Sequence, residues 1–539
     1  MNKAYSIIFV LLNSIFVFIG CSQRPEKNFS DADIFRYNEA AGITSLDPGF
    51  AKNQAHIWVC NQLYNSLVQL DDSLNVVPAL AESWRVDSTG LRYTFNLRED
   101  VYFHANSFFT AKQARLMTAK DVVFSLERLR SNSLAAPGSW TLSNVQKGGI
   151  QALDPHTIEI KLEKPFPAFL GLLTMQYCSI LSKDAYAHYG KTYFDHAIGT
   201  GPFYYKLWVD RVKLVLRKNS DYFEFSNGER LPHLESVAIR FIPDKFSAFL
   251  EFVKGDLDFI SGIDASYKDE VLDFDGQLRE KYQGDIQLLK QNYLNTEYLG
   301  FMVDQEKSTY PYNNVHFRRA VNFAFDRDKM IRYLRNGIGT AAEDGMIPNG
   351  LPSFEKTGHF SFNTDSVAHY LQLADYNGQG SPTIVLHTNN SYLDLCEYIQ
   401  FSLREAGINL DIEVHPPSTL RQLISAQKVS FFRASWIADY PDAENYLSLF
   451  YSENFAPNGP NYTHFERKEF DQLYQRSYAE TNFEKRKAMY RKMNRMVLDQ
   501  AVVVPLFYDE VYRFSAKGTT GLGGNALNLL SLKNVKKSK

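Results

Sequence analysis

The sequence predicts an α/β protein with more than one domain. A chain of 539 residues can bury a large core and is long enough for two or more domains. Its 45% hydrophobic and 22% charged residues are ordinary for a soluble globular protein. From Phe35 onward, segments with strand patterns and segments with helix patterns alternate along the chain, which is typical of an α/β fold.

Charge and aromatic content restrict the class of partner. The formal net charge of −3 does not show the excess of basic residues that is typical of nucleic-acid-binding proteins, so no nucleic-acid partner is expected. Aromatic residues are the compositional deviation, with 40 Phe and 32 Tyr. Such residues fill cores and half-exposed strands, and they also line ligand clefts. Their number alone therefore does not decide between these roles.

The N-terminus has the composition of a targeting segment. Lys3 supplies a positive charge, and an apolar run follows from Tyr5 to Ile19. Ser6, Asn13 and Ser14 interrupt this run, which makes it too short and too polar for a typical transmembrane helix. We predict a signal peptide over residues 1–20.

A small residue directly before a cysteine ends this segment, at Gly20-Cys21. The arrangement resembles a lipobox, with Phe18 in place of the usual Leu. We predict that Cys21 is diacylated and that residues 21–34 tether the globular part to a membrane surface. The alternative is a plain secretory peptide with a chance cysteine.

Three cysteines remain after this segment, Cys60, Cys178 and Cys396. They are far apart, odd in number and without metal-ligand spacing, so they define neither a disulfide framework nor a zinc site. We expect buried thiols. We expect no cofactor and no metal site in the chain.

Several elements of the first half are predicted locally. Tyr93 to Arg98 has the alternating polarity of a strand. Thr118 is a capping residue before an amphipathic helix that reaches Arg128. The glycines around Thr200 suggest a phosphate loop, but no Gly-Lys-Ser/Thr follows and Pro202 blocks the helix that such a loop must open. Nucleotide binding is therefore rejected.

The second half contains equally clear elements. Val315 to Arg327 has apolar residues at helical spacing, and Gly345 to Pro352 has the composition of a loop. A charged helix is predicted over Phe483 to Gln500. A strand rich in β-branched and aromatic residues is predicted over Val502 to Phe514, around Pro505.

The stretch from Ser430 to Leu449 is central to the functional prediction. A strand is predicted up to Trp436, then a turn over Asp439-Tyr440-Pro441-Asp442, then helical spacing from Ala443 to Phe450. This places Asp439 at the mouth of a strand-to-helix loop, where ligand contacts tend to lie in α/β proteins. On local pattern alone the favoured interpretation of Asp439 is a turn or capping residue, with Asp442 the better cap.

The segment WIADYPDAENYL resembles a signature of the oligopeptide- and dipeptide-binding proteins, the family 5 solute receptors of bacterial ABC importers. The resemblance covers roughly residues 35 to 530 and rests on motifs in the same order. The motifs lie at Val77–Trp84, Thr118–Arg128, Ile198–Phe203, Leu216–Phe223, Leu250–Asp258 and Val315–Arg327. The chain departs from the family at Phe103–Asn106, which lacks the usual aspartate-glycine turn, and over Ser107–Met117, which has the character of an insertion.

The resemblance implies a two-lobed periplasmic-binding-protein fold, type II-like, with hinged lobes and an extra subdomain inserted in the first lobe. It implies a crossing to the second lobe near Asn292 to Met302. The expected domain boundaries are 35–76 for the start of the first lobe, 77–198 for the inserted subdomain, 199–297 for the rest of the first lobe, 298–507 for the second lobe, and 508–539 for the return to the first lobe and the C-terminal tail.

The resemblance also implies a function without chemistry. The protein would capture short peptides between its lobes and deliver them to permease subunits with an ATPase, as a monomer in the cell envelope, anchored to a membrane on the periplasmic or extracellular side. Closure of the lobes would be the signal that the permease reads. Asp439 would pair with the α-ammonium group of the peptide.

Further site residues follow from this expectation. Ser435, Trp436 and Ile437 are candidates for a strand edge that pairs with the backbone of an extended peptide. Tyr440 would pack beside the ammonium group or belong to the scaffold. Arg433 would meet a carboxylate or a lobe partner, or form a structural ion pair.

Two other readings stay open at this point. The same fold could bind a nickel chelate, haem, an oligosaccharide or a murein peptide. Asp439, Asp442 and Glu444 could instead imitate the paired carboxylates of a hydrolase, but no Gly-x-Ser-x-Gly, His-Glu-x-x-His or Cys-His arrangement accompanies them. We therefore predict a binding protein and not an enzyme.

Overall fold

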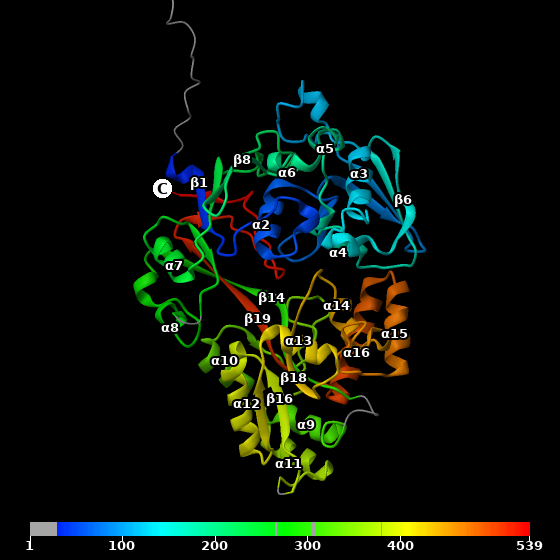
Figure 1. The fold of residues 1–539 in the computed structure, drawn as a ribbon, viewed down its shortest axis with the longest axis vertical. Coiled ribbons are helices and arrows are strands. Elements are labelled where there is room, and N and C mark those ends of the chain that lie inside the picture. Colours follow the sequence, from blue (N-terminus) through cyan, green and yellow to red (C-terminus); the bar gives the residue numbers. More distant parts are fainter. Residues whose placement is uncertain (1–29, 265–266, 304–308, 379, 539) are drawn as a thin grey trace, which may run out of the picture.

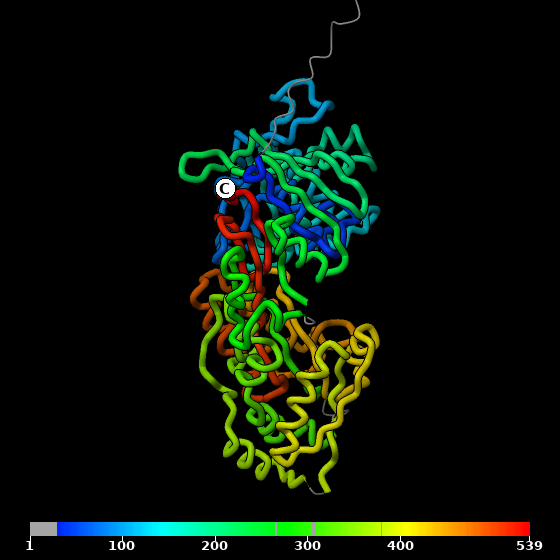
Figure 2. Tube along the Cα trace, turned by 90° about the vertical axis from the view of Figure 1, so that its left-hand side faces the viewer, coloured from blue at the N-terminus to red at the C-terminus, as the bar shows by residue number. Residues whose placement is uncertain are grey.

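The computed structural model describes residues 30–264, 267–303, 309–378 and 380–538, which form two lobes joined by long strands (Figure 1). We call residues 30–285 and 517–538 the first lobe and residues 302–502 the second lobe. In the side view of Figure 2 the two lobes are stacked end to end, which gives the molecule an elongated shape. Cys21, the predicted signal peptide and the predicted tether up to residue 29 lie outside the described residues, whereas residues 30–34 of the predicted tether are described and Ile34 already begins a strand.

The first lobe, apart from its inserted part, combines a portion of a large mixed sheet with a few helices. Its strands are β1 (Ile34–Asn38), β2 (Val68–Leu70), β3 (Val76–Pro78), β8 (Phe203–Val209), β9 (Lys213–Lys218), β10 (Phe225–Ser226), β11 (Glu229–Arg230), β12 (Ser236–Arg240), β13 (Phe259–Ser261), β20 (Thr519–Thr520) and β21 (Lys536–Lys537). Its helices are α2 (Gln54–Leu63), α7 (Lys245–Val253) and α8 (Lys268–Val271).

The inserted part of the first lobe is built on its own antiparallel sheet of order β4-β5-β7-β6. The elements are β4 (Ala81–Val86), β5 (Arg92–Leu97), α3 (Ala119–Leu129), β6 (Val145–Asp154), β7 (Thr157–Leu162), α4 (Phe169–Leu172), α5 (Lys183–Tyr189) and α6 (Tyr193–His196). The predicted cap of α3 is confirmed. Thr118 forms a capping box with Asp121, which satisfies backbone N–H groups at the helix start.

The second lobe carries most of the long helices. Its helices are α9 (Val315–Phe323), α10 (Arg327–Arg335), α11 (Thr364–Leu373), α12 (Leu393–Glu405), α13 (Pro417–Ser425), α14 (Glu444–Leu447), α15 (Lys468–Ala479) and α16 (Phe483–Gln500). Its strands are β15 (Thr340–Ala341), β16 (Ile384–Thr388), β17 (Leu410–Val414) and β18 (Phe431–Ile437).

Two strands, β14 (Ile286–Phe301) and β19 (Val503–Ala516), run antiparallel to each other through both lobes (Figure 1). They join strands of both lobes into one sheet of order β17-β16-β18-β14-β19-β13-β1-β12-β9-β8, in which β15 also pairs with β19. The ladder between them shifts register after Asn292 and again next to Pro505, which has no N–H to donate. The predicted crossing region, Asn292 to Met302, therefore lies in β14 up to Phe301 and ends one residue after the strand.

Local patterns in the second half are confirmed. The charged helix predicted over Phe483 to Gln500 is α16, and the strand predicted around Pro505 is β19. The predicted helix from Val315 to Arg327 is divided into α9 and the start of α10. Arg318 and Arg327 are buried there and donate to the backbone carbonyls of Gln500 and Pro505, each at 2.7 Å, so these arginines pack the lobe.

The predicted turn before β8 is a place of close backbone approach. The Gly201 N–H donates to the carbonyl of Leu63, at the end of α2, over 3.0 Å. A Cβ atom on Gly199 would collide with that carbonyl and would lie 2.6 Å from Cδ1 of Tyr64. Only glycine fits here, which explains the sequence motif without a bound phosphate.

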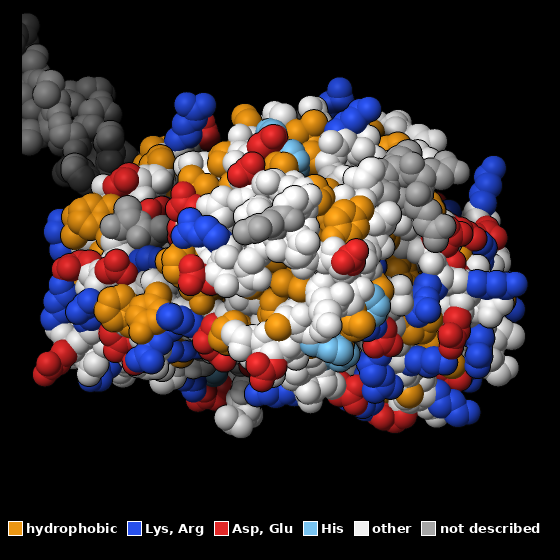
Figure 3. Space-filling model, turned by 90° about the horizontal axis from the view of Figure 1, so that it is seen from below, with side chains coloured by type: hydrophobic (Ala, Val, Ile, Leu, Met, Phe, Trp, Pro, Cys, Tyr) orange, Lys and Arg blue, Asp and Glu red, His pale blue; other side chains and the backbone are white. Residues whose placement is uncertain are grey.

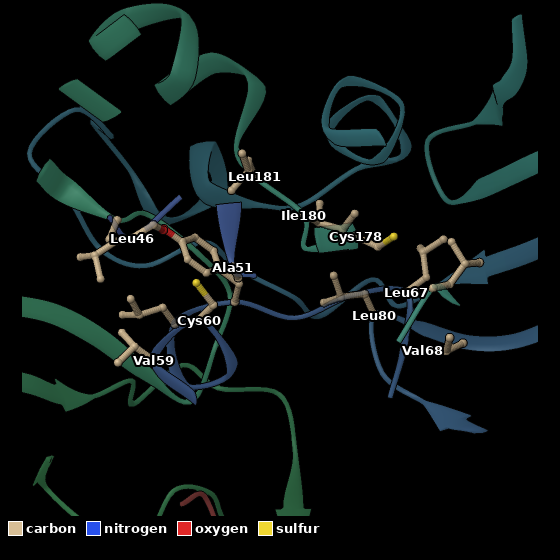
Figure 4. Packing of buried hydrophobic residues seen from close by; sticks show 14 of the residues in the cluster. Leu46, Ala51, Val59, Cys60, Leu67, Val68, Leu80, Cys178, Ile180 and Leu181 are labelled. Carbon is tan, nitrogen blue, oxygen red and sulfur yellow. The ribbon is translucent and has the colours of Figure 1, made fainter. Parts of the chain in front are cut away.

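The three remaining cysteines are buried and free. Cys60 and Cys178 lie in the large apolar cluster of the first lobe, each among aliphatic side chains from different segments (Figure 4). Cys396 belongs to an apolar cluster of the second lobe. The prediction of buried thiols is confirmed, and burial raises the pKa of the Cys178 thiol to about 12.

The surface carries both signs of charge. On the face at the end of the second lobe, Lys and Arg side chains are interspersed with Asp and Glu (Figure 3). This pattern agrees with the formal net charge of −3. In the part of the chain that the structure describes, no helix is both long enough and apolar enough to cross a membrane.

We predict that Gly199→Ala lowers the free energy of unfolding by about 1–3 kcal/mol, because the new methyl group has no space against Leu63 and Tyr64. Urea denaturation followed by circular dichroism measures the shift of the midpoint. Gly284→Ala is the matched control, since a Cβ atom there meets no heavy atom within 4 Å. Equal midpoints for the two variants would contradict this packing argument.

Candidate functional site

The loop after β18 is fixed at the point where β14 crosses between the lobes. The Ala438 N–H donates to the carbonyl of Leu294 over 2.8 Å, and the Tyr446 hydroxyl donates to the same oxygen over 2.7 Å. The Leu294 N–H donates in turn to the carbonyl of Ala526 from the first lobe, also at 2.8 Å. Asp439 therefore follows a residue that is held by the crossing strand.

The rest of the predicted turn is closed by side-chain hydrogen bonds. Asp442 Oδ1 accepts from the Glu444 N–H at 2.9 Å, at the start of α14. Asn445 Oδ1 accepts from Trp436 Nε1 at 2.8 Å, which ties the end of β18 to that helix. Asp442 thus closes a turn directly before α14, whereas Ala443 occupies the N-cap position and forms no side-chain capping bond.

A cavity of about 430 Å³ lies between the lobes at this loop. From the first lobe it is lined by Ala51, Lys52, Asn53, Gln54, Ile57, Trp58, Leu70, Thr174, Met175, Gln176, Tyr177, Leu527, Asn528 and Leu529. Tyr293 of the crossing strand and Ile437, Ala438 and Asp439 of the second lobe complete the wall. The size and the mixture of apolar and polar groups are those of a small-molecule site.

The charges in this cavity are sparse and of opposite sign. Among the described residues that line it, Lys52 and Asp439 are the only charged ones. Lys52 belongs to the first lobe, Asp439 belongs to the second, and both side chains are exposed. A solute with one positive and one negative group would therefore find a partner on each lobe.

The protein around Asp439 raises its carboxyl pKa by desolvation, although a hydrogen bond from Asn445 opposes the shift. Across the cavity, burial raises the pKa of the Tyr177 hydroxyl, and the charge of Asp439 raises it further. The carboxylate of Asp439 thus lies near Tyr177 of the first lobe and is partly desolvated. A bound cation would relieve that cost.

The edge of β18 beside this cavity is open. The strand pairs with β14 over its whole length, from Phe431 to Ile437, but β16 meets it only at Phe432. In the described ranges no strand covers the second edge from Ala434 to Ile437. The Ser435 and Ile437 side chains are exposed, and Ile437 lines the cavity. This edge has the free N–H and C=O groups that strand addition uses.

Arg433 has its partners inside the second lobe. Its guanidinium is buried, forms an ion pair with the buried Glu297, and lies 3.2 Å from the ring centroid of Tyr392. Asn295 and Tyr392 also donate to the Glu297 carboxylate, at 3.1 and 3.3 Å. Of the two roles weighed for Arg433, this environment is that of a structural ion pair.

Tyr440 lies at a contact between the lobes. Its hydroxyl donates to Glu444, a buried carboxylate that also accepts from Tyr474 and from Tyr478. Phe166, from the inserted part of the first lobe, meets the Tyr440 ring edge-on with 6.1 Å between centroids, and it stacks on Tyr478 at 5.2 Å. Tyr440 is thereby placed in the scaffold that brings the two lobes into contact.

The structure therefore brings Ile437 and Asp439 to the cavity, with Ser435 on the adjacent strand edge. It places Arg433, Trp436 and Tyr440 against partners within the protein. Sequence reasoning missed the first-lobe wall, because Lys52 and Tyr177 carry no local motif and reach the cavity only through folding. A second cavity of about 500 Å³ in the first lobe shares Leu70, Thr174, Gln176 and Leu529 with the first.

Two lobes that share crossing strands and enclose a cavity between them define a solute-binding protein. Comparison with known proteins gives the same class. Residues 75–458 match the family described as bacterial extracellular solute-binding proteins, family 5. The chain belongs to this family, and the resemblance noted in its motifs is confirmed.

Individual relatives cover nearly the whole chain. Heme-binding protein A of Haemophilus influenzae is 27% identical over 510 residues, which are 90% of this chain and 88% of that protein. The structure of HbpA2 from Haemophilus parasuis matches with a TM-score of 0.82 and 22% identity, over 94% of this chain and all of that one. The periplasmic binding protein DppA of Helicobacter pylori, in complex with the peptide STSA, matches with a TM-score of 0.70 and 25% identity, over 94% and 98% of the chains. The predicted two-lobed α/β fold is confirmed.

We predict that Arg433→Met lowers the free energy of unfolding by about 3–5 kcal/mol, because it leaves the charge of Glu297 buried without its partner. The double variant Arg433→Met with Glu297→Leu should lose less free energy of unfolding than Arg433→Met alone, because it removes both charges. Chemical denaturation of the wild type and the variants measures both losses. A stable Arg433→Met variant with weakened solute binding would instead make Arg433 a ligand residue.

Proposed function

We propose that this protein is the membrane-anchored receptor of an ABC importer and captures short peptides between its two lobes. The observation that carries the proposal is the pair of opposite charges in the interlobe cavity, Lys52 on the first lobe and Asp439 on the second. A short peptide has one ammonium group and one carboxylate at its ends. It can therefore contact both lobes with groups that do not depend on its side chains.

Asp439 would hold the α-ammonium group. The carboxylate stands at the mouth of a loop fixed by Leu294, so little flexibility is lost when it binds. Its raised pKa reflects the cost of an incompletely solvated charge, and an ammonium group would remove that cost. A charge-assisted hydrogen bond in such a site is strong enough to fix one end of the peptide.

The open edge of β18 would take the backbone. An extended peptide beside Ser435 and Ile437 could form ladder hydrogen bonds with the strand, and these bonds are the same for every sequence. The side chains of the peptide would then point alternately to either side, as in any strand. This arrangement gives affinity for peptides as a class.

Closure follows from contacts with both lobes. A solute that touches only one lobe has the same affinity for the open and the closed arrangement, so it does not change the equilibrium between them. A peptide held by Asp439 on one lobe and by Lys52 on the other favours the closed arrangement and offers the permease a recognisable state. No step in this cycle changes the solute chemically.

Haem and oligosaccharides fit these charges less well. The relatives include a heme-binding protein and a structure with a bound peptide, so the family alone does not choose the solute. Haem carries two carboxylates and an oligosaccharide carries no fixed charge, whereas a cavity with one anion and one cation is complementary to a zwitterion. The lipid anchor at Cys21 is proposed from the sequence motif that precedes the described residues.

We predict that Asp439→Asn weakens the binding of peptides with a free amine by at least about 2 kcal/mol, roughly 30-fold, and leaves folding intact. Isothermal titration calorimetry with peptides retained from a mixed pool measures the loss. For the wild type, N-acetylation of the peptide should lower the binding affinity by about the same amount as the Asp439→Asn substitution. For the Asp439→Asn variant, N-acetylation should cause little further loss of affinity, because the substitution has already removed the same charge pair.

Asp365→Asn is the matched control for this experiment, since it removes an exposed carboxylate of the second lobe at the start of α11. Its affinity should equal that of the wild type. Unchanged affinity in Asp439→Asn would remove Asp439 from the site. Equal losses in the two variants would show a general effect of net charge.

We predict a smaller effect for Lys52→Met, because its side chain is exposed in the cavity. The affinity for peptides with a free carboxylate should fall by about 1 kcal/mol, roughly fivefold, and that for C-terminally amidated peptides should stay the same. Lys254→Met, on the exposed end of α7, serves as control. A loss that is equal for the two kinds of peptide would contradict a role of Lys52 in carboxylate recognition.

A further inference from the structure

Two histidines and a glutamate meet at one edge of the second lobe. His387 lies on β16 and Glu413 on the edge strand β17, and the two residues are directly paired in the parallel ladder. His415 follows Glu413 by two positions, so its side chain projects from the same face of the sheet. Register and alternation together bring three potential metal ligands to one place.

The distances between the ligand atoms match a metal site. His387 Nδ1 lies 3.0 Å from His415 Nε2 and 3.3 Å from Glu413 Oε2, and His415 Nε2 lies 3.7 Å from the same Oε2. A circle through these three atoms has a radius of about 2.0 Å, which equals the bond lengths of zinc to imidazole nitrogen and carboxylate oxygen. The three distances therefore allow one ion to lie within bonding distance of all three atoms.

Burial and charge fit the same reading. The imidazole side chains of His387 and His415 are 14% and 20% exposed, whereas that of Glu413 is 56% exposed. Two neutral imidazoles and one carboxylate carry a single negative charge, which complements a divalent cation.

We propose that His387, Glu413 and His415 bind one divalent transition-metal ion of the zinc, nickel or copper type. Imidazole nitrogen favours these ions over magnesium and calcium, which prefer oxygen ligands throughout. Three protein ligands leave at least one coordination position for water or for another donor. This site is separate from the interlobe cavity and does not depend on the identity of the transported solute.

The position in the fold indicates what bound metal would do. The three ligands stand at or just after the carboxyl ends of β16 and β17, and β18 runs parallel to β16 and ends at the loop that carries Asp439. The ion would join the edge strand β17 to β16, its neighbour in the sheet, through side chains as well as through the backbone. It would therefore stabilise the second lobe at its edge.

The test is a titration of the full chain with Zn²⁺ after treatment with a chelator, with protein purified without a polyhistidine tag. Competition with a chromophoric chelator should give one bound ion per chain, and zinc should raise the melting temperature. His387→Ala and His415→Ala should each weaken binding at least about tenfold, since loss of even an outer-shell partner costs 10–100-fold. Glu413→Gln should weaken binding to a smaller extent.

His369→Ala is the matched control, because His369 is an exposed histidine of the same lobe on α11. It should bind zinc as the wild type does. X-ray absorption at the zinc edge provides a readout without mutation and should show two imidazoles in the coordination shell. The proposal is overturned if the chain does not bind one ion saturably. It is also overturned if His387→Ala and His415→Ala bind zinc as tightly as the control does, provided that their melting temperatures without metal equal that of the metal-free wild type.

Discussion

The antiparallel pairing of β14 with β19 is the constraint on which the two-lobed arrangement depends. Both strands run through the two lobes, and the ladder between them is interrupted just after Asn292, where the chain passes from one lobe to the other. The loop that carries Asp439 is bonded to Leu294 inside this interruption, and the segment around Ala526 is bonded to the same residue. Any movement of the lobes about the crossing strands therefore takes place beside the cavity wall, which couples solute contacts to closure.

Local patterns predicted much of the fold for identifiable reasons. The periodicity of Phe483 to Gln500 and the capping residue Thr118 report on single helices, and both predictions match the structure. The turn after β18 was predicted because proline and aspartate interrupt both strand and helix. The family motif then singled out Asp439, a residue whose local pattern favours an ordinary turn.

The remainder depends on tertiary contacts that no local pattern encodes. Lys52 precedes a helix cap and has no distinguishing neighbour in sequence, yet folding places it in the cavity with Asp439. Arg433 and Tyr440 were natural candidates for ligand contacts, and only the positions of Glu297 and Glu444 reveal their partners inside the protein. His387 and Glu413 become neighbours through the register of a parallel pair, which the sequence does not specify.

The central claim is that the interlobe cavity recognises a small zwitterion by its two ends, and native mass spectrometry of protein purified without denaturation tests it most directly. Gentle release of the bound material should yield a heterogeneous set of short peptides, because the contacts proposed at Asp439 and at the open edge of β18 would not depend on the side chains of the peptide. A single defined metal complex, haem or sugar, with no peptide retained even after a peptide mixture is offered, would contradict the account.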